Sequence, residues 1–84
     1  MSIKVKSPVF IDTLKLECVS TTSSNLKGVL KDEKGSVCST FESEYRAGQE
    51  EFMWRGLNDL PYGVYTLELS QGEDAMQMRL VKRV

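Results

Sequence analysis

Apolar and polar residues alternate with a period of two in several short runs, and this alternation limits the possible fold more than any other feature. Between residues 13 and 19, Leu14, Leu16 and Cys18 would lie on one side of an extended strand and Lys15 and Glu17 on the other. A helix needs apolar residues three and four positions apart, and no such stripe lasts beyond two turns in this sequence. The alternation therefore predicts an all-β protein.

Residues that favour turns separate the alternating runs. The spacing predicts seven strands, at residues 3–10, 13–19, 26–31, 36–42, 50–57, 64–70 and 75–82. Polar loops are predicted at residues 20–25 and 43–49, and a tight turn at residues 32–35. Seven short strands joined by connections too short for helical crossovers are typical of an immunoglobulin-like β-sandwich. We expect residues 1–84 to form one such domain of about seven antiparallel strands.

The inward face of each predicted strand supplies the predicted core. Its members are Leu14, Leu16, Leu26, Leu30, Val37, Phe41, Phe52, Trp54, Leu60, Tyr65, Leu67, Leu69, Met76, Met78 and Leu80. Pro8 interrupts the first strand and has no backbone N–H to donate, so that strand should lie at a sheet edge or change sheets.

The charge of the chain argues against a nucleic-acid partner, and the length of its apolar runs argues against a membrane span. Eleven basic and twelve acidic residues give a net charge of −1, so no positive field is available to hold a nucleic-acid backbone. No apolar run approaches the ~20 residues that a membrane span needs. The alternating residues 1–6 also lack the apolar block of a signal peptide. We therefore expect neither nucleic-acid binding nor a membrane span.

The chain also lacks the residues on which most catalytic and metal sites depend. It has no histidine, which is the usual general base near neutral pH and the commonest zinc ligand. Cys18 and Cys38 lack the C-x-x-C spacing of metal and redox motifs, and we expect them to be buried free thiols. We predict no enzyme activity, no metal and no cofactor.

Six of the twelve acidic residues suggest a calcium site or a glycosidase: Asp32, Glu33, Glu42, Glu44, Glu73 and Asp74. A calcium loop would need a ligand at the position that Lys34 occupies, and paired catalytic carboxylates need a cleft. We expect these residues to be solvated.

The segment Leu60–Tyr65 has the form L-x-x-G-x-Y at the start of the sixth predicted strand. A tyrosine just past a glycine turn suits a tyrosine corner, in which a buried ring donates its hydroxyl to a backbone carbonyl a few residues upstream. We predict this structural role for Tyr65.

Three aromatic residues allow an alternative function. Tyr45, Trp54 and Tyr62 could form a flat platform for sugar rings, which would make the chain a carbohydrate-binding module. Trp54 alternates with Phe52 on a face that should be interior, so its exposure distinguishes the two hypotheses.

Four segments carry a pattern of short motifs: residues 8–16 (PVFIDTLKL), 30–37 (LKDEKGSV), 57–67 (LNDLPYGVYTL) and 79–84 (RLVKRV). In order and spacing, these segments resemble the C-terminal sorting domain of type IX secretion cargo from Bacteroidota. Together they span nearly the whole chain.

The resemblance implies an immunoglobulin-like sandwich at the end of an exported protein, read by the translocon of the outer membrane. Under this resemblance, Asp32 and Gly35 correspond to the family's D-x-x-G turn and Gly63 and Tyr65 to its G-x-Y motif. Lys82 and Arg83 correspond to its basic terminal strand. The resemblance therefore implies a sorting module whose partners are proteins of the secretion machinery and whose location is secreted or at the cell surface. The turn around Gly63 and residues 75–84 would form the recognised surface.

A second resemblance implies the same sandwich in another role. The W-x-G of residues 54–56 and the G-x-Y of residues 63–65 look like the immunoglobulin-like domain of flagellar hook-capping proteins. That likeness implies a surface module for assembly or interaction.

Overall fold

The computed structural model describes residues 3–18, 23–46, 48 and 51–83, with the side chains of Cys18 and Tyr45 outside this description. Within these residues eight strands form: β1 (Ile3–Val5), β2 (Val9–Phe10), β3 (Leu14–Cys18), β4 (Ser24–Lys31), β5 (Val37–Tyr45), β6 (Glu51–Trp54), β7 (Gly63–Gln71) and β8 (Asp74–Lys82). The prediction of an all-β protein is confirmed. The count is one higher than expected because the first predicted strand is divided.

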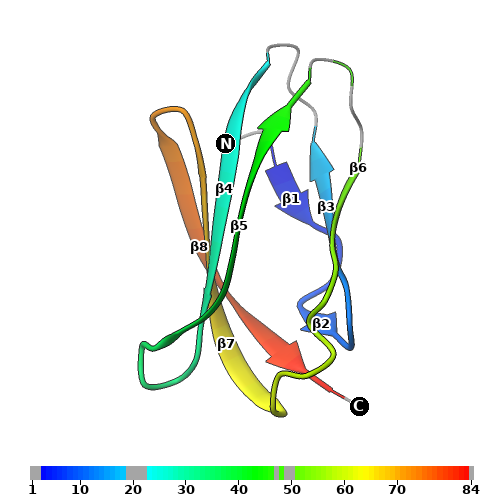
Figure 1. Ribbon diagram of the computed structural model, residues 1–84, viewed down its shortest axis with the longest axis vertical. Helices are drawn as coiled ribbons and strands as arrows, with labels where there is room; N and C mark the ends of the chain where they lie inside the picture. The colour runs from blue at the N-terminus through cyan, green and yellow to red at the C-terminus, as the bar shows by residue number, and fades with distance from the viewer. Residues whose placement is uncertain (1–2, 19–22, 47, 49–50, 84) are drawn as a thin grey trace.

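The strands form two sheets that pack as an immunoglobulin-like β-sandwich (Figure 1). One sheet has the order β1-β3-β6 and the other the order β2-β8-β7-β4-β5. The predicted antiparallel pairing holds for every described pair except β2 with β8, which is parallel. That exception arises because the first strand changes sheets.

The chain changes sheets at Pro8, as the missing proline donor predicted. Strand β1 pairs with β3 in the smaller sheet, whereas β2 pairs with the end of β8 in the larger one. The carbonyl of Pro8 accepts a 2.8 Å hydrogen bond from the backbone N–H of Val81. Because the change of sheet shifts the alternation, Ile3 and Phe10 are both buried although they would lie on opposite faces of one continuous strand.

The core lies between the sheets and consists mainly of leucine. Its fully buried side chains are Leu14, Leu16, Leu26, Leu30, Leu57, Leu67, Leu69 and Leu80. Trp54 and Tyr65, both predicted core residues, are also buried. Five more predicted members are partly buried against this core: Phe41, Phe52, Leu60, Met76 and Met78. Sequence analysis missed Ile3, Phe10 and Leu57.

The prediction that Val37 belongs to the core is wrong, since its side chain is 57% exposed. A bulge in the pairing of β4 with β5 explains the error. Leu30 lies opposite Ser39 but Lys31 lies opposite Val37, so Cys38 is the extra residue on β5. The bulge moves Val37 to the outer face, and Cys38 packs against the core. Cys38 is a half-buried free thiol, whereas the side chain of Cys18 lies outside the described residues.

Two long strands extend into regions predicted as polar loops. Strand β4 already begins at Ser24, and β5 continues to Tyr45. Residues 19–22, three of which belong to the first predicted loop, and residues 47, 49 and 50, in and next to the second, lie outside the described residues. The cross-strand pairs Ser24 with Tyr45 and Asn25 with Glu44 continue the ladder, so pairing overrides the low strand propensity of these polar residues.

No helix long and apolar enough to cross a membrane occurs in the described part of the chain.

Candidate functional site

Two turns far apart in the sequence lie at the same end of the sandwich, the end at which β8 finishes (Figure 1). One joins β4 to β5 and the other precedes β7. They enclose an open depression of about 480 Å³. The depression is lined by Asp32, Glu33, Lys34, Cys38, Pro61, Tyr62, Gly63, Val64 and Tyr65. Three of the six residues implied by the resemblance line it: Asp32, Gly63 and Tyr65.

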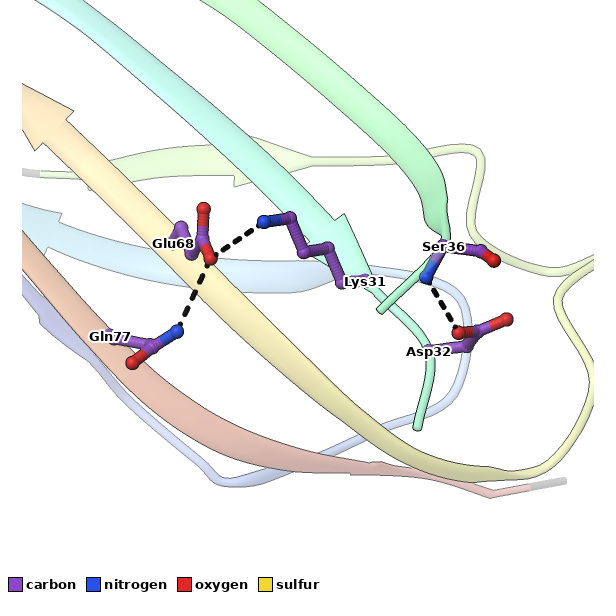
Figure 2. A network of polar contacts seen from close by, with 5 residues as sticks. All are labelled: Lys31, Asp32, Ser36, Glu68 and Gln77. Atoms are coloured by element: carbon purple, nitrogen blue, oxygen red, sulfur yellow. Dashed lines mark hydrogen bonds and ion pairs between the residues drawn. The ribbon is translucent and has the colours of Figure 1, made fainter. Parts of the chain in front are cut away.

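The turn from β4 to β5 is closed by the Asp32 side chain. Its Oδ1 accepts a 2.9 Å hydrogen bond from the backbone N–H of Lys34. The same oxygen accepts a 2.9 Å hydrogen bond from the backbone N–H of Ser36 (Figure 2). The backbone N–H of Asp32 also donates to the carbonyl of Ser36 at 2.9 Å. Gly35 has a φ of 85°, a conformation that residues with a Cβ rarely adopt. Asp32 and Gly35 therefore define the shape of this turn.

The opposing turn is held by the predicted tyrosine corner, which the structure confirms. The Tyr65 hydroxyl donates a 2.6 Å hydrogen bond to the carbonyl oxygen of Pro61. The ring is only 4% exposed and meets the edge of Phe10 at a centroid distance of 6.1 Å. Gly63 has a φ of 147° where the chain enters β7.

The Tyr65 hydroxyl has a perturbed acidity. Its pKa is raised from the ordinary value of 10.0, first because burial removes water from the phenolate and then because Cys38 and Asp32 lie nearby. Tyr65 thus stays a neutral hydrogen-bond donor at all but strongly alkaline pH.

The end of β8 lies beside this turn, because Lys82 pairs with Gly63. Lys82 is only 3% exposed, and its Nζ donates a 3.0 Å hydrogen bond to the carbonyl of Arg83. The same ammonium lies 5.8 Å from the centroid of the Tyr62 ring, within the range of a cation–π contact. Arg83 is exposed, and its backbone N–H donates to Phe10 at 2.9 Å.

Thus all six residues implied by the resemblance lie at one end of the sandwich, within or beside the depression: Asp32, Gly35, Gly63, Tyr65, Lys82 and Arg83. Asp32, Gly35, Gly63 and Tyr65 shape the two turns and Lys82 is buried, whereas the Arg83 side chain is exposed. The exposed side chains that line the depression include Tyr62, Glu33 and Lys34. Sequence analysis had not singled out Lys34 for recognition, although a charged residue in a tight turn is a signal of exposure.

The aromatic platform does not form around Trp54, which is 5% exposed and packs edge-on against Phe41 at 4.6 Å between ring centroids. Its place on the inner face of β6 explains why it is not available to a sugar. Tyr62 is 66% exposed, and the side chain of Tyr45 lies outside the described residues. The structure therefore leaves Tyr62 as the one described aromatic of the three that faces solvent.

The acidic residues do not gather into a metal site in the described part of the chain, where no three or more carboxylates or thiols lie together. At the sandwich end, one carboxylate oxygen of Asp32 already accepts hydrogen bonds from two backbone N–H groups. The chemistry that this end offers is contact through exposed aromatic and charged side chains.

Comparison with models of known protein families finds no match, and comparison with curated proteins finds none either.

Proposed function

We propose that this chain is a non-catalytic sorting module, recognised by the outer-membrane translocon of type IX secretion through protein contacts at the end of the sandwich. One observation carries the proposal. Residues 30–37 and 57–67, which resemble sorting-domain motifs in their sequence, contribute to the lining of one depression, and the end of β8 lies beside it. The protein would then be secreted or carried to the cell surface.

The accessible side chains of this end suit a protein partner. Tyr62 offers an exposed ring, and such aromatic side chains are enriched where proteins contact one another. Arg83 and Lys34 add positive charges and Glu33 a negative one. The side-chain hydrogen bonds of Asp32 and Tyr65 hold the two turns, so a partner would meet a surface that is already ordered.

The proposal is tested by secretion of a reporter. Residues 1–84 are fused behind a signal peptide and a fluorescent reporter in a Bacteroidota host with type IX secretion. We expect the fusion to reach the medium or the cell surface, and the reporter without residues 1–84 to stay in the periplasm. A wild-type fusion that stays in the periplasm would contradict the sorting role.

Variants then locate the recognised surface. Tyr62→Ala combined with Arg83→Glu should retain the reporter in the periplasm. Met53→Ala is a matched control, since Met53 is also an exposed apolar residue but lies on β6. Purified variants should melt at the wild-type temperature, so that retention reflects recognition. If Met53→Ala blocks secretion as strongly as the double variant, the sandwich end is not the recognised surface.

A further inference from the structure

Strand β5 is a long sheet edge without a strand neighbour on its outer side. It lies last in the order β2-β8-β7-β4-β5 and pairs only with β4 among the described residues. It is nine residues long, whereas the described edge strands β1, β2 and β6 have only two to four. An edge of this length presents a row of backbone N–H and C=O groups that can pair with another extended chain.

The inner side of this edge is lined by aromatic rings. Phe41 of β5 stacks on Phe52 of β6 at 4.8 Å between centroids, and both are only partly buried. Figure 1 shows β5 and β6 facing each other across the sandwich. Because β6 is itself the last strand of its sheet, a strand added to β5 would bring its inward side chains to these two rings.

The outer side of the edge is acidic. Glu42 and Glu44 are exposed and two residues apart, so they lie on the same face of β5. Neither has an ion-pair partner among the described residues. The nearest positive charge across the ladder is Lys27, opposite Glu42.

We propose that the β5 edge binds an extended segment of another protein in which basic and apolar residues alternate. The segment would pair its backbone with β5, place its basic side chains beside Glu42 and Glu44, and lay its apolar side chains against Phe41 and Phe52. Backbone pairing gives such complexes their affinity and alternate side chains give their specificity. A second copy of this strand is a poor occupant, because registers centred on Glu42 to Glu44 bring carboxylates together.

This site is separate from the proposed sorting surface, since Tyr62 and Arg83 take no part in it. The test uses a fluorescent peptide of roughly eight residues that repeats Ile-Lys-Val-Lys. Affinity is measured by fluorescence anisotropy in about 150 mM salt, where long-range attraction is screened. A peptide with Glu in place of Lys should bind about tenfold more weakly or worse, because it places carboxylates beside Glu42 and Glu44.

Backbone pairing is tested by a peptide with the same side chains and N-methyl groups on its backbone amides. It keeps every charge but loses its donors, and we expect binding to weaken about tenfold or more. Equal affinity of the methylated and unmethylated peptides would overturn the proposal.

Variants of the protein test the acidic pair. Glu42→Lys with Glu44→Lys should weaken binding of the basic peptide about tenfold and strengthen that of the acidic peptide. The control, Glu73→Lys with Asp74→Lys, makes the same charge change at exposed positions near the β7–β8 turn and should alter affinity less than about threefold. Equal losses in the two variants would assign binding to net charge alone. Sedimentation showing a dimer through β5 would assign the edge to a second copy, and either result rejects the proposal.

Discussion

The ring of Phe41 lies against the backbone of Gly28, in the space that a side chain on Gly28 would need. The two residues are opposite each other on β5 and β4. From this position Phe41 reaches both Phe52 and Trp54 of the other sheet. The missing side chain of Gly28 thus allows one aromatic residue to join the two sheets.

Gly28→Ala should therefore destabilise the protein. Alanine in a strand would normally gain about 0.5–1 kcal/mol over glycine, but displacing a packed ring costs about 1–3 kcal/mol. We expect a net loss of about 1–2 kcal/mol in the free energy of unfolding, measured with urea. In a Phe41→Leu background, Gly28→Ala should lower the free energy of unfolding less than it does in the wild-type protein. A Gly28→Ala protein as stable as wild type would show that the ring moves aside freely.

Tyr65→Phe isolates the hydrogen bond of the tyrosine corner. The ring stays in place, but the 2.6 Å bond to the Pro61 carbonyl is lost. We expect the free energy of unfolding to fall by roughly 0.5–1.5 kcal/mol, the scale of one net hydrogen bond. Tyr62→Phe is the matched control, since that side chain is exposed and should change stability little. Equal effects of the two substitutions would argue against the corner.

Stability should depend on alkaline pH through Tyr65. Its pKa is raised in the folded protein, mainly by burial, so above about pH 10 the unfolded chain loses this proton first. The unfolded state then binds fewer protons, and stability falls as the pH rises from about 10 toward the folded pKa. Chemical unfolding between pH 8 and pH 11 should show a shallower fall for Tyr65→Phe than for wild type, a difference absent below about pH 9. Parallel pH profiles of the two proteins would count against this assignment.

Asp32 should stabilise the turn through its side-chain oxygen rather than its charge. Asp32→Ala removes the acceptor for two backbone donors and should cost about 1–2 kcal/mol. Asp32→Asn keeps an amide oxygen in the same position and should retain at least about half of that stability. Glu33→Ala, at the exposed neighbour, serves as the control in thermal unfolding. If asparagine is as damaging as alanine, the charge is the essential property.

Lys31, Glu68 and Gln77 connect β4, β7 and β8 on the outer face of the larger sheet (Figure 2). The Lys31 Nζ lies 3.0 Å from Glu68 Oε2, which also accepts a 3.2 Å hydrogen bond from Gln77 Nε2. Because both charged side chains are about one-third exposed, solvent screens the pair. A double-mutant cycle with Lys31→Met and Glu68→Gln should give a coupling of about 0.2–1 kcal/mol, reduced in about 1 M salt. A coupling free energy that is the same at low and high salt would contradict an electrostatic origin of the Lys31–Glu68 interaction.

The alternation predicted the sheet-forming parts of the fold well because it reports directly on a face buried against another sheet. It failed where the chain leaves regular geometry. The bulge at Cys38 turned Val37 outward, and the departure from the sheet after Trp54 placed Leu57 in the core. Such shifts depend on which partner a strand finds, and that information lies in distant segments.

The candidate site shows the same division. The tyrosine corner could be predicted from a few neighbouring residues, since its hydrogen bond spans four positions. The sequence could not predict that Asp32 and Tyr62 line one depression, because their proximity depends on the pairing of β4 with β7 across the sheet. The free edge of β5 was also beyond the sequence pattern, which indicates strands but not their order.

The pairing of β2 with β8 constrains when this chain can finish folding. Val9 pairs with Val81, 72 residues later, so β2 completes its ladder only after all the residues between them have been synthesised. Contacts between such distant positions are slow to form because a long loop must close first. During folding the hairpins can form early, whereas the closing of the sandwich around Phe10 must wait for β8.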